Sequence, residues 1–367
     1  MNRYLFMPLV IYIPVGIYLF FVFRRFFCLL GLKKKSIATT LLSIFLVLAS
    51  VFWGWRLFGF GGVVVLHFAV ISFFMDLLNF IFKQLLPMGS KKVWDTLYRS
   101  SLTSLLVMAI IFGYGYWNIH HVIPAGYTIE TEKNLPGDVK IAQISDLHAG
   151  NVFSFQQLEQ CLKQIQEEQP DLFVLTGDIF DESTTREEME KTIEMLSQIQ
   201  TTYGTYYVFG NHDYNYYSLS PFYTVNELRK ALTDAGIHVL EDETVQVTDF
   251  LTVVGRKDRS VSRKSLQELV AAVNPNTFIL VLDHQPKGLS ENQNTGADLQ
   301  LSGHTHAGQI WPTGQLGTLT GAVELNYGLK SMDHYQVLVS SGIAGWGYPI
   351  RTGGHSEYVI VTVKSNR

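Results

Sequence analysis

The sequence predicts an all-α transmembrane module of about four helices at residues 1–118, followed by an α/β domain at residues 119–367. Three observations lead to this prediction. The chain is longer than one hydrophobic core usually supports. Its apolar residues are concentrated before residue 118, and after Pro124 short apolar runs alternate with helical patterns. A membrane module followed by a separate layered domain accounts for all three.

The N-terminal module contains four apolar runs, at 4–23, 37–55, 58–82 and 101–117. Each is near the roughly 20 residues that a helix needs to cross about 30 Å of hydrocarbon. A cleaved signal peptide is the alternative for the first run, but Arg24 and Arg25 follow it where cleavage would require small residues. We therefore expect a multi-pass membrane protein.

Positive charge in the connections predicts an orientation for these spans. The first connection carries five Lys/Arg residues and the third carries four, whereas the second carries only Arg56. Cytoplasmic loops hold the Lys/Arg excess, so the first and third loops are expected in the cytoplasm and the C-terminal domain on the far side. Asp76 and His67 lie within the third run, where an ionisable group suggests function. The alternative for Asp76 is that it reaches the interface or pairs with a neighbouring helix.

The domain after Pro124 reads as strands and helices in alternation. Residues 140–144, 172–175 and 206–209 are predicted strands, and 154–168 and 185–199 are the helices between them, with Ser154 as an N-cap. Such an order is typical of α/β domains, whose functional loops lie beyond the carboxyl ends of the strands. Further short strands are expected at about 238–240, 245–247, 251–254, 278–282, 299–302, 335–339 and 358–363.

Charge excludes one class of partner for this domain. Of the 28 Lys/Arg and 32 Asp/Glu residues of the chain, 17 and 30 respectively follow residue 118, which gives the domain a formal charge of −13. Binding to nucleic acid depends largely on Lys and Arg contacts with phosphate. We therefore expect no nucleic-acid partner.

Side chains that can bind metal ions follow five of the predicted strands directly. They are Asp146 and His148, Asp178, Asn211 and His212, His284, and His304 and His306. Carboxylate, amide and imidazole ligands together suit Mn, Fe or Zn better than Ca. Glycines at 177, 210 and 303 permit close approach of the backbone to a ligand. One such match is more often a turn or a core residue, but five loops in one domain predict a shared metal site.

These motifs resemble one known family when they are taken together. Asp-x-His at 146–148, Gly-Asp-x-x-Asp at 177–181, Gly-Asn-His-Asp at 210–213, His284 and Gly-His-Thr-His at 303–306 resemble the calcineurin-like metallophosphoesterase superfamily. Its bacterial membrane-associated branch is resembled by three finer motifs: Ile144-Ser-Asp-Leu-His148, His284-Gln-Pro286 and Gly303-His-Thr-His-Ala-Gly-Gln309. The resemblance implies a four-layer sandwich and two divalent metal ions. It assigns one metal to Asp146, His148, Asp178 and His306, and the other to Asp178, Asn211, His284 and His304, with Asp178 bridging. It also implies that His212 protonates the leaving oxygen and that Asp213 orients or tunes it.

Four further features each have two interpretations. Asp181 either aligns a ligand imidazole or caps its loop. Asp283 either adds negative charge beside the second metal or faces solvent. Arg351 either clamps a phosphate or forms a surface salt bridge. The aromatic segment 214–223 either receives an acyl chain or membrane surface, or packs as an ordinary long loop.

The sequence thus predicts a membrane-anchored dimetal phosphohydrolase that uses metal-activated hydroxide on a phosphorylated, lipid-linked or envelope substrate. The catalytic domain is expected on the extracytoplasmic side of a bacterial inner membrane. One alternative is a pyrophosphohydrolase of the UDP-2,3-diacylglucosamine type, whose substrate is made in the cytoplasm. Another is a non-catalytic membrane sensor or transporter, which the intact ligand set disfavours.

Overall fold

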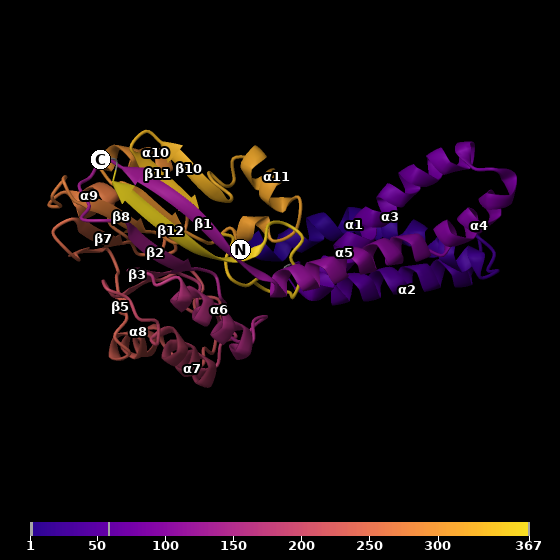
Figure 1. Cartoon of the computed structure of the whole chain (residues 1–367). Coiled ribbons are helices and arrows are strands. Elements are labelled where there is room, and N and C mark those ends of the chain that lie inside the picture. The colour runs from indigo at the N-terminus through magenta and orange to yellow at the C-terminus, as the bar shows by residue number, and fades with distance from the viewer. Residues whose placement is uncertain (1–2, 58, 366–367) are drawn as a thin grey trace. The chain divides into compact units, whose positions relative to one another are not determined.

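The computed structural model describes residues 3–57 and 59–365, and the chain divides into two compact units, Met1–Tyr114 and Gly115–Arg367 (Figure 1). The first unit is helical. It contains α1 (Arg3–Leu29), α2 (Ile37–Trp53), α3 (Phe60–Leu85), α4 (Met88–Arg99) and most of α5 (Leu102–His120), which continues into the second unit.

Within residues 3–57 and 59–365, three helices are long and apolar enough to cross a membrane, with candidate spans at Pro8–Leu29, Phe60–Leu85 and Leu102–His120. The remaining predicted run, at 37–55, forms α2, whose 17 residues lie at the short end of the range for a span. Phe58, at the start of the third predicted run, lies outside the described residues. The sequence interpretation missed α4, which carries Lys91, Lys92 and Arg99.

Asp76 of α3 pairs with neighbouring helices, as one of its two interpretations predicted. Its Oδ1 atom lies 2.6 Å from Nη1 of Arg25 and accepts a hydrogen bond of 2.8 Å from the Tyr98 hydroxyl. Its Oδ2 atom accepts a 2.8 Å hydrogen bond from the hydroxyl of Tyr18. His67 bonds through Nδ1 to the carbonyl of Val63, one turn earlier in the same helix. These contacts give both residues a structural role.

The second unit contains two mixed sheets of 6 strands each in its described residues. The first has the order β1-β12-β2-β3-β4-β5, made of β1 (Val122–Thr131), β12 (Ser356–Ser365), β2 (Val139–Ile144), β3 (Leu172–Thr176), β4 (Thr205–Val208) and β5 (His238–Val239). The second has the order β10-β11-β9-β8-β7-β6, made of β10 (Gly328–Met332), β11 (Tyr335–Val339), β9 (Leu299–Ser302), β8 (Phe278–Leu282), β7 (Leu251–Gly255) and β6 (Glu243–Gln246). Its helices are α6 (Phe155–Glu167), α7 (Arg186–Leu196), α8 (Val225–Asp234), α9 (Leu266–Val270), α10 (Leu289–Asn292) and α11 (Thr313–Leu319), with short 3₁₀ turns at Gln293–Thr295 and His306–Gly308.

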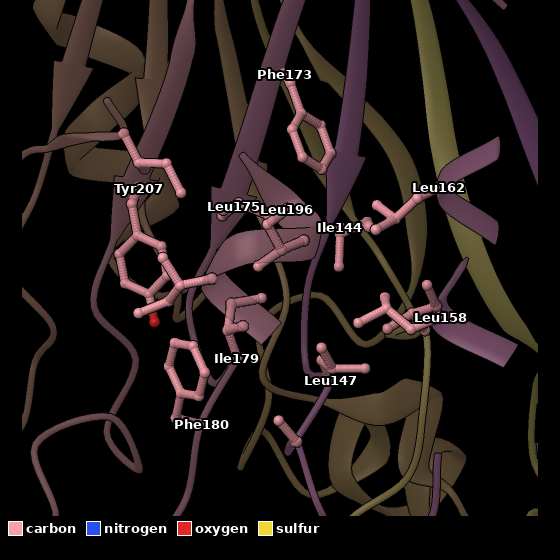
Figure 2. Packing of buried hydrophobic residues seen from close by; sticks show 14 of the residues in the cluster. Ile144, Leu147, Leu158, Leu162, Phe173, Leu175, Ile179, Phe180, Leu196 and Tyr207 are labelled. Atoms are coloured by element: carbon pink, nitrogen blue, oxygen red, sulfur yellow. The ribbon is translucent and has the colours of Figure 1, made fainter. Parts of the chain in front are cut away.

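Side chains along each central strand point alternately to the two faces of its sheet, which explains how the layers pack. In β3, Leu172 and Val174 belong to a buried cluster that includes residues of both sheets, so they lie between the sheets. Phe173 and Leu175 point the other way and pack with α6, α7 and α8, as Figure 2 shows for Leu158, Leu162 and Leu196. A third cluster packs α9 and α10 on the outer face of the second sheet. The unit is therefore a four-layer helix–sheet–sheet–helix sandwich, as predicted.

The carboxyl ends of the central strands meet at one edge of this sandwich. β2, β3 and β4 are parallel to one another, and β7, β8 and β9 are parallel in the other sheet. Gln143 at the end of β2 donates hydrogen bonds of 2.7 Å to Oγ1 of Thr176 and 3.0 Å to the carbonyl of Ser302. This buried amide joins β2, β3 and β9, so the loops that follow them must lie together.

Candidate metal centre

Asp146, His148 and His306 form the first of two groups that could hold a metal ion. Their ligand atoms all lie within 4.8 Å of one another; Asp146 and His148 are fully buried, and the side chain of His306 is 12% exposed. Nε2 of His306 lies 3.4 Å from Nε2 of His148 and 3.6 Å from Oδ1 of Asp146. Two imidazole nitrogens and a carboxylate oxygen that converge at these distances match the ligand types of Mn, Fe and Zn.

Asp178, His284 and His304 form the second group, directly beside the first. Nε2 of His284 lies 3.0 Å from Oδ2 of Asp178 and 3.2 Å from Nδ1 of His304. The backbone N–H of His304 donates to both oxygens of Asp146 at 3.0 Å, which ties the second group to the first. Nδ1 of His284 lies 2.8 Å from the carbonyl of Thr176, a contact that fixes the ring orientation and leaves Nε2 for a ligand role.

Asn211 follows β4 and supplies a further test of whether these residues fit a metal. Its Oδ1 atom is buried and accepts no hydrogen bond within the described part of the chain. A buried polar atom without a partner costs about 1–3 kcal/mol, so such atoms usually mark a ligand, water or ion. An amide oxygen beside carboxylates and imidazoles fits a divalent cation, in agreement with the ligand set that the family resemblance implies.

The candidate ligands share a strained backbone conformation. Five of them have φ between 45° and 74°, the left-handed region that residues other than glycine rarely adopt. They are Asp146, His148, Asp178, His304 and His306. Each such residue costs of order 1–3 kcal/mol, and such strain is concentrated at functional sites. Five strained residues among seven predicted ligands therefore support a functional site on independent grounds.

Two glycines allow the ligand loops to approach one another. A Cβ atom on Gly210 would lie 2.1 Å from Oδ1 of Asp178, and one on Gly303 would lie 1.7 Å from Oγ of Ser145 and 2.3 Å from Oδ2 of Asp146. Both contacts are far inside van der Waals distance, so neither position can hold a side chain without moving the site. The predicted role of these glycines in close approach is confirmed.

Burial and charge set the protonation of the candidate ligands. Burial disfavours the negative charge of Asp178 and the positive charge of His284, but each of these charges stabilises the other. Their attraction holds the pKa of Asp178 well below its usual range and raises the pKa of His284 well above it. Burial lowers the pKa of His304 to about 4 and, with the nearby His148, lowers the pKa of His306 well below its usual value. His304 and His306 are therefore neutral at pH 7, the form that binds metals.

His212 lies at the rim of this site and contacts Glu182, a residue that the sequence interpretation missed. Its Nδ1 atom lies 3.0 and 3.1 Å from the two carboxylate oxygens of Glu182, and its backbone N–H donates a 2.8 Å hydrogen bond to Oδ1 of Asp178. Burial opposes a positive charge on the imidazole, but the hydrogen bond to Glu182 and the charge of Asp178 outweigh it and raise the pKa of His212 to about 9. The ring therefore carries a proton at neutral pH.

Asp213 is buried beneath the same loops. Its carboxylate accepts hydrogen bonds from the backbone N–H groups of Asp178, Phe180 and Gly210, at 2.8, 2.9 and 2.7 Å. Burial and the neighbouring charge of Asp178 raise the pKa of Asp213 to about 7. These bonds tie the loops after β3 and β4 together, so Asp213 holds the backbone that carries both Asp178 and His212.

Asp181 fulfils both of its interpretations at once. Its Oδ1 atom accepts hydrogen bonds from the backbone N–H and hydroxyl of Ser183 at 2.8 and 2.6 Å, which caps the loop. Its Oδ2 atom lies 3.4 Å from Nδ1 of His148, so it also faces the outer nitrogen of a candidate ligand. The charge and hydrogen bond of His148 lower the pKa of Asp181 to about 2 against the opposing effect of burial.

Neither interpretation of Arg351 is correct. The side chain is fully buried, and its guanidinium donates to the carbonyls of His306, Ser341, Ala344 and His355. It is therefore neither a phosphate clamp nor a surface salt bridge. Because it binds the carbonyl of His306, it holds a ligand loop in place from behind.

The solvent-facing interpretation of Asp283 is wrong. Its carboxylate is fully buried and forms ion pairs of 3.0 Å with Arg256 and 2.9 Å with Arg263. The adjacent His284 contacts Asp178 instead, so the two neighbouring side chains have different partners. Arg256 is itself buried at this pair.

The aromatic segment 214–223 is partly packed in the core and partly exposed. Tyr214 and Tyr223 are buried in the core, whereas Tyr216, Tyr217 and Phe222 are exposed. The ring of Tyr217 lies 5.3 Å from the ring of His212, measured between centroids. The exposed part of the segment therefore borders the candidate acid.

Comparisons with known proteins agree with this geometry. Residues 139–308 match the calcineurin-like phosphoesterase family, a range that contains every candidate ligand. The uncharacterized metallophosphoesterase YkoQ of Bacillus subtilis is 30% identical over 242 residues, which cover 63% of this chain and 86% of YkoQ. This chain belongs to the calcineurin-like metallophosphoesterase family.

Two further relatives extend the comparison. An uncharacterized metallophosphoesterase of Aquifex aeolicus is 29% identical over 268 residues, which cover 71% of this chain and 98% of the relative. A transmembrane protein with a metallophosphoesterase domain from Danio rerio is 25% identical over 285 residues, which cover 73% of this chain and 63% of the relative. The candidate spans and this membrane-protein relative together indicate association with a membrane.

Proposed function

We propose that this metallophosphoesterase is a membrane-anchored dimetal phosphohydrolase, with a membrane module at 1–118 and a catalytic domain at 119–367. The observation that carries the proposal is the placement of two candidate ligand groups side by side, with His212 held next to them by its backbone hydrogen bond to Asp178. Asp146, His148, Asp178 and His306 would hold one divalent cation. Asp178, Asn211, His284 and His304 would hold the other.

When bound in this site, a pair of divalent cations would supply a water of lowered pKa and neutralise charge on the phosphoryl group. The chain itself contributes positioning and a proton. His212 would give its Nε2 proton to the leaving oxygen, because its Nδ1 atom is occupied by Glu182. Asp213 and Arg351 hold the loops that carry Asp178 and His306, which keeps the ligands in register.

The proposed substrate is a phosphoester that is lipid-linked or belongs to the cell envelope. The support is that exposed Tyr217 lies beside His212, where the non-reacting part of a bound ester would lie. The Lys/Arg-rich first and third connections favour an extracytoplasmic catalytic domain in a bacterial inner membrane, if α2 crosses together with the three longer helices.

The test uses the full chain in phospholipid vesicles with Mn²⁺. We expect hydrolysis of bis-p-nitrophenyl phosphate or of a phosphomonoester and two bound metal ions per chain. With diphenyl phosphate, whose leaving group needs a proton, His212→Ala should lower kcat by at least about 10²-fold. Asp178→Asn should lower both the metal content and the rate. A wild-type chain that binds two metal ions and hydrolyses neither ester would contradict the proposal and favour the non-catalytic alternative.

A further inference from the structure

The segment 307–323, which directly follows His306, differs from the rest of the domain in charge. It contains no Asp, Glu, Lys or Arg, although the domain as a whole carries a formal charge of −13. Much of the segment is exposed, including residues 315–316 and 318–322. An exposed neutral stretch in a highly charged domain is unusual for a surface that faces only water.

The same segment exposes three large apolar side chains. Trp311 is 65% exposed, and Leu316 and Leu319 of α11 are 51% and 82% exposed. Leu316 and Leu319 are three residues apart on one helix, so they lie on the same face. Tryptophan is the side chain that favours the boundary between lipid and water, where its ring is apolar and its N–H remains polar.

Hydrogen bonds connect this segment to the end of the last candidate span. The backbone N–H of Trp311 donates a 3.0 Å bond to Oγ1 of Thr352. The adjacent Arg351 donates its backbone N–H to the carbonyl of Gly115 at 2.9 Å and accepts a 3.1 Å bond from Nδ2 of Asn118. Gly115 and Asn118 belong to the part of α5 inside the second unit. Gly115 precedes the end of that helix by a rise of about 8 Å, comparable to the depth at which interfacial side chains lie.

We infer that Trp311, Leu316 and Leu319 insert into the headgroup region of the leaflet at which α5 ends. The inference rests on the proposed membrane-spanning role of α5. A lipid surface fits this patch because the patch is neutral and apolar. Trp311 is also hydrogen-bonded to Thr352, and the neighbouring Arg351 is hydrogen-bonded to Gly115 of α5. His304 and His306 directly precede the segment, so the contact holds the ligand loop against the bilayer. The substrate class that fits is a phosphoester at a membrane surface.

The test measures the depth of Leu319 in the bilayer. The full chain carrying Cys28→Ser and Leu319→Cys is labelled with a nitrobenzoxadiazole dye, because the native Cys161 is buried. It is reconstituted in vesicles of phosphatidylethanolamine and phosphatidylglycerol, with or without phosphatidylcholine that bears a nitroxide near the top of its acyl chain. Glu190→Cys, on an exposed position of α7, is the matched control.

We expect the nitroxide lipid to lower the emission of the dye at residue 319 by about twofold or more, because interfacial side chains lie at that depth. Emission at residue 190 should change little. A dye at 319 that is unquenched and red-shifted would show a patch in water, and one that is unquenched but blue-shifted would show a patch covered by protein. Either result overturns the inference. Hydrolysis of bis-p-nitrophenyl phosphate by the unlabelled chain tests the proposed function separately, since quenching requires no catalysis.

Discussion

Replacing Glu182 by alanine should slow hydrolysis of esters with poor leaving groups far more than hydrolysis of esters with good ones. Both oxygens of Glu182 lie within 3.1 Å of Nδ1 of His212, and both side chains are mostly shielded from water. A hydrogen bond between charged groups contributes about 1.5–3 kcal/mol. If that energy orients His212 in the transition state, its loss lowers kcat by about 10- to 150-fold.

The assay compares kcat for diphenyl phosphate and bis-p-nitrophenyl phosphate at saturating Mn²⁺. A nitrophenolate leaves readily without a proton, so only the phenyl ester depends strongly on the acid. Glu182→Gln keeps an oxygen acceptor and should recover part of the lost rate. Glu187→Ala is the matched control, because this exposed carboxylate lies in the first turn of α7.

Two results would refute this reasoning. One is an equal loss of rate for both esters, which would indicate general damage to the site. The other is a full additional loss when Glu182→Ala is combined with His212→Ala, since residues that act as one unit are not additive.

Three further predictions concern metal, packing and stability. Removing metal with a chelator should abolish hydrolysis, and restoring Mn²⁺ at 100 times Kd should raise the free energy of unfolding by about 2.7 kcal/mol per site. In thermal denaturation that is a rise in Tm of roughly 5–10 °C; an unchanged Tm would contradict it. Gly303→Ala should lower kcat by about 10²-fold because the new Cβ displaces Asp146. Gly126→Ala, where no atom lies within 4 Å, should leave the rate unchanged in the same assay. Asp283→Asn should cost about 3–5 kcal/mol in denaturant unfolding, because Arg256 stays buried without its partner. Metal content should not change, and a lower metal content would support the interpretation that Asp283 tunes the site.

Much of the domain was predictable because its central strands are buried on both faces and read as continuous apolar runs. β2, β3, β4, β8 and β9 all appear within a residue or so of their predicted positions. β1 was missed because it lies at the edge of its sheet, contains Pro124 and Gly126, and shows only partial burial. α4 was missed because its charged residues made it look like a connection.

The candidate ligands were predictable because strand ends fix where the following side chains lie. Sequence order cannot show which way a loop side chain turns, however, so the partner of His212 was not foreseen. Glu182 lies in the same loop as Asp181, and nothing in the sequence indicates that it turns towards His212 and Asp181 towards His148. Arg351 was misread for a related reason, since burial of a charged side chain depends on distant carbonyls.

The pairing of β1 with β12 bears on how the domain folds. These strands pair in parallel over ten positions, from Val122 with Ser356 to Thr131 with Ser365, although more than 200 residues separate them. Contacts at such separation form slowly because the entropy of closing the loop comes first. Until β12 enters between β1 and β2, both strands present open edges that can recruit other chains. Truncation before Ser356 should therefore yield an aggregating or rapidly degraded protein, even though every candidate ligand would still be present.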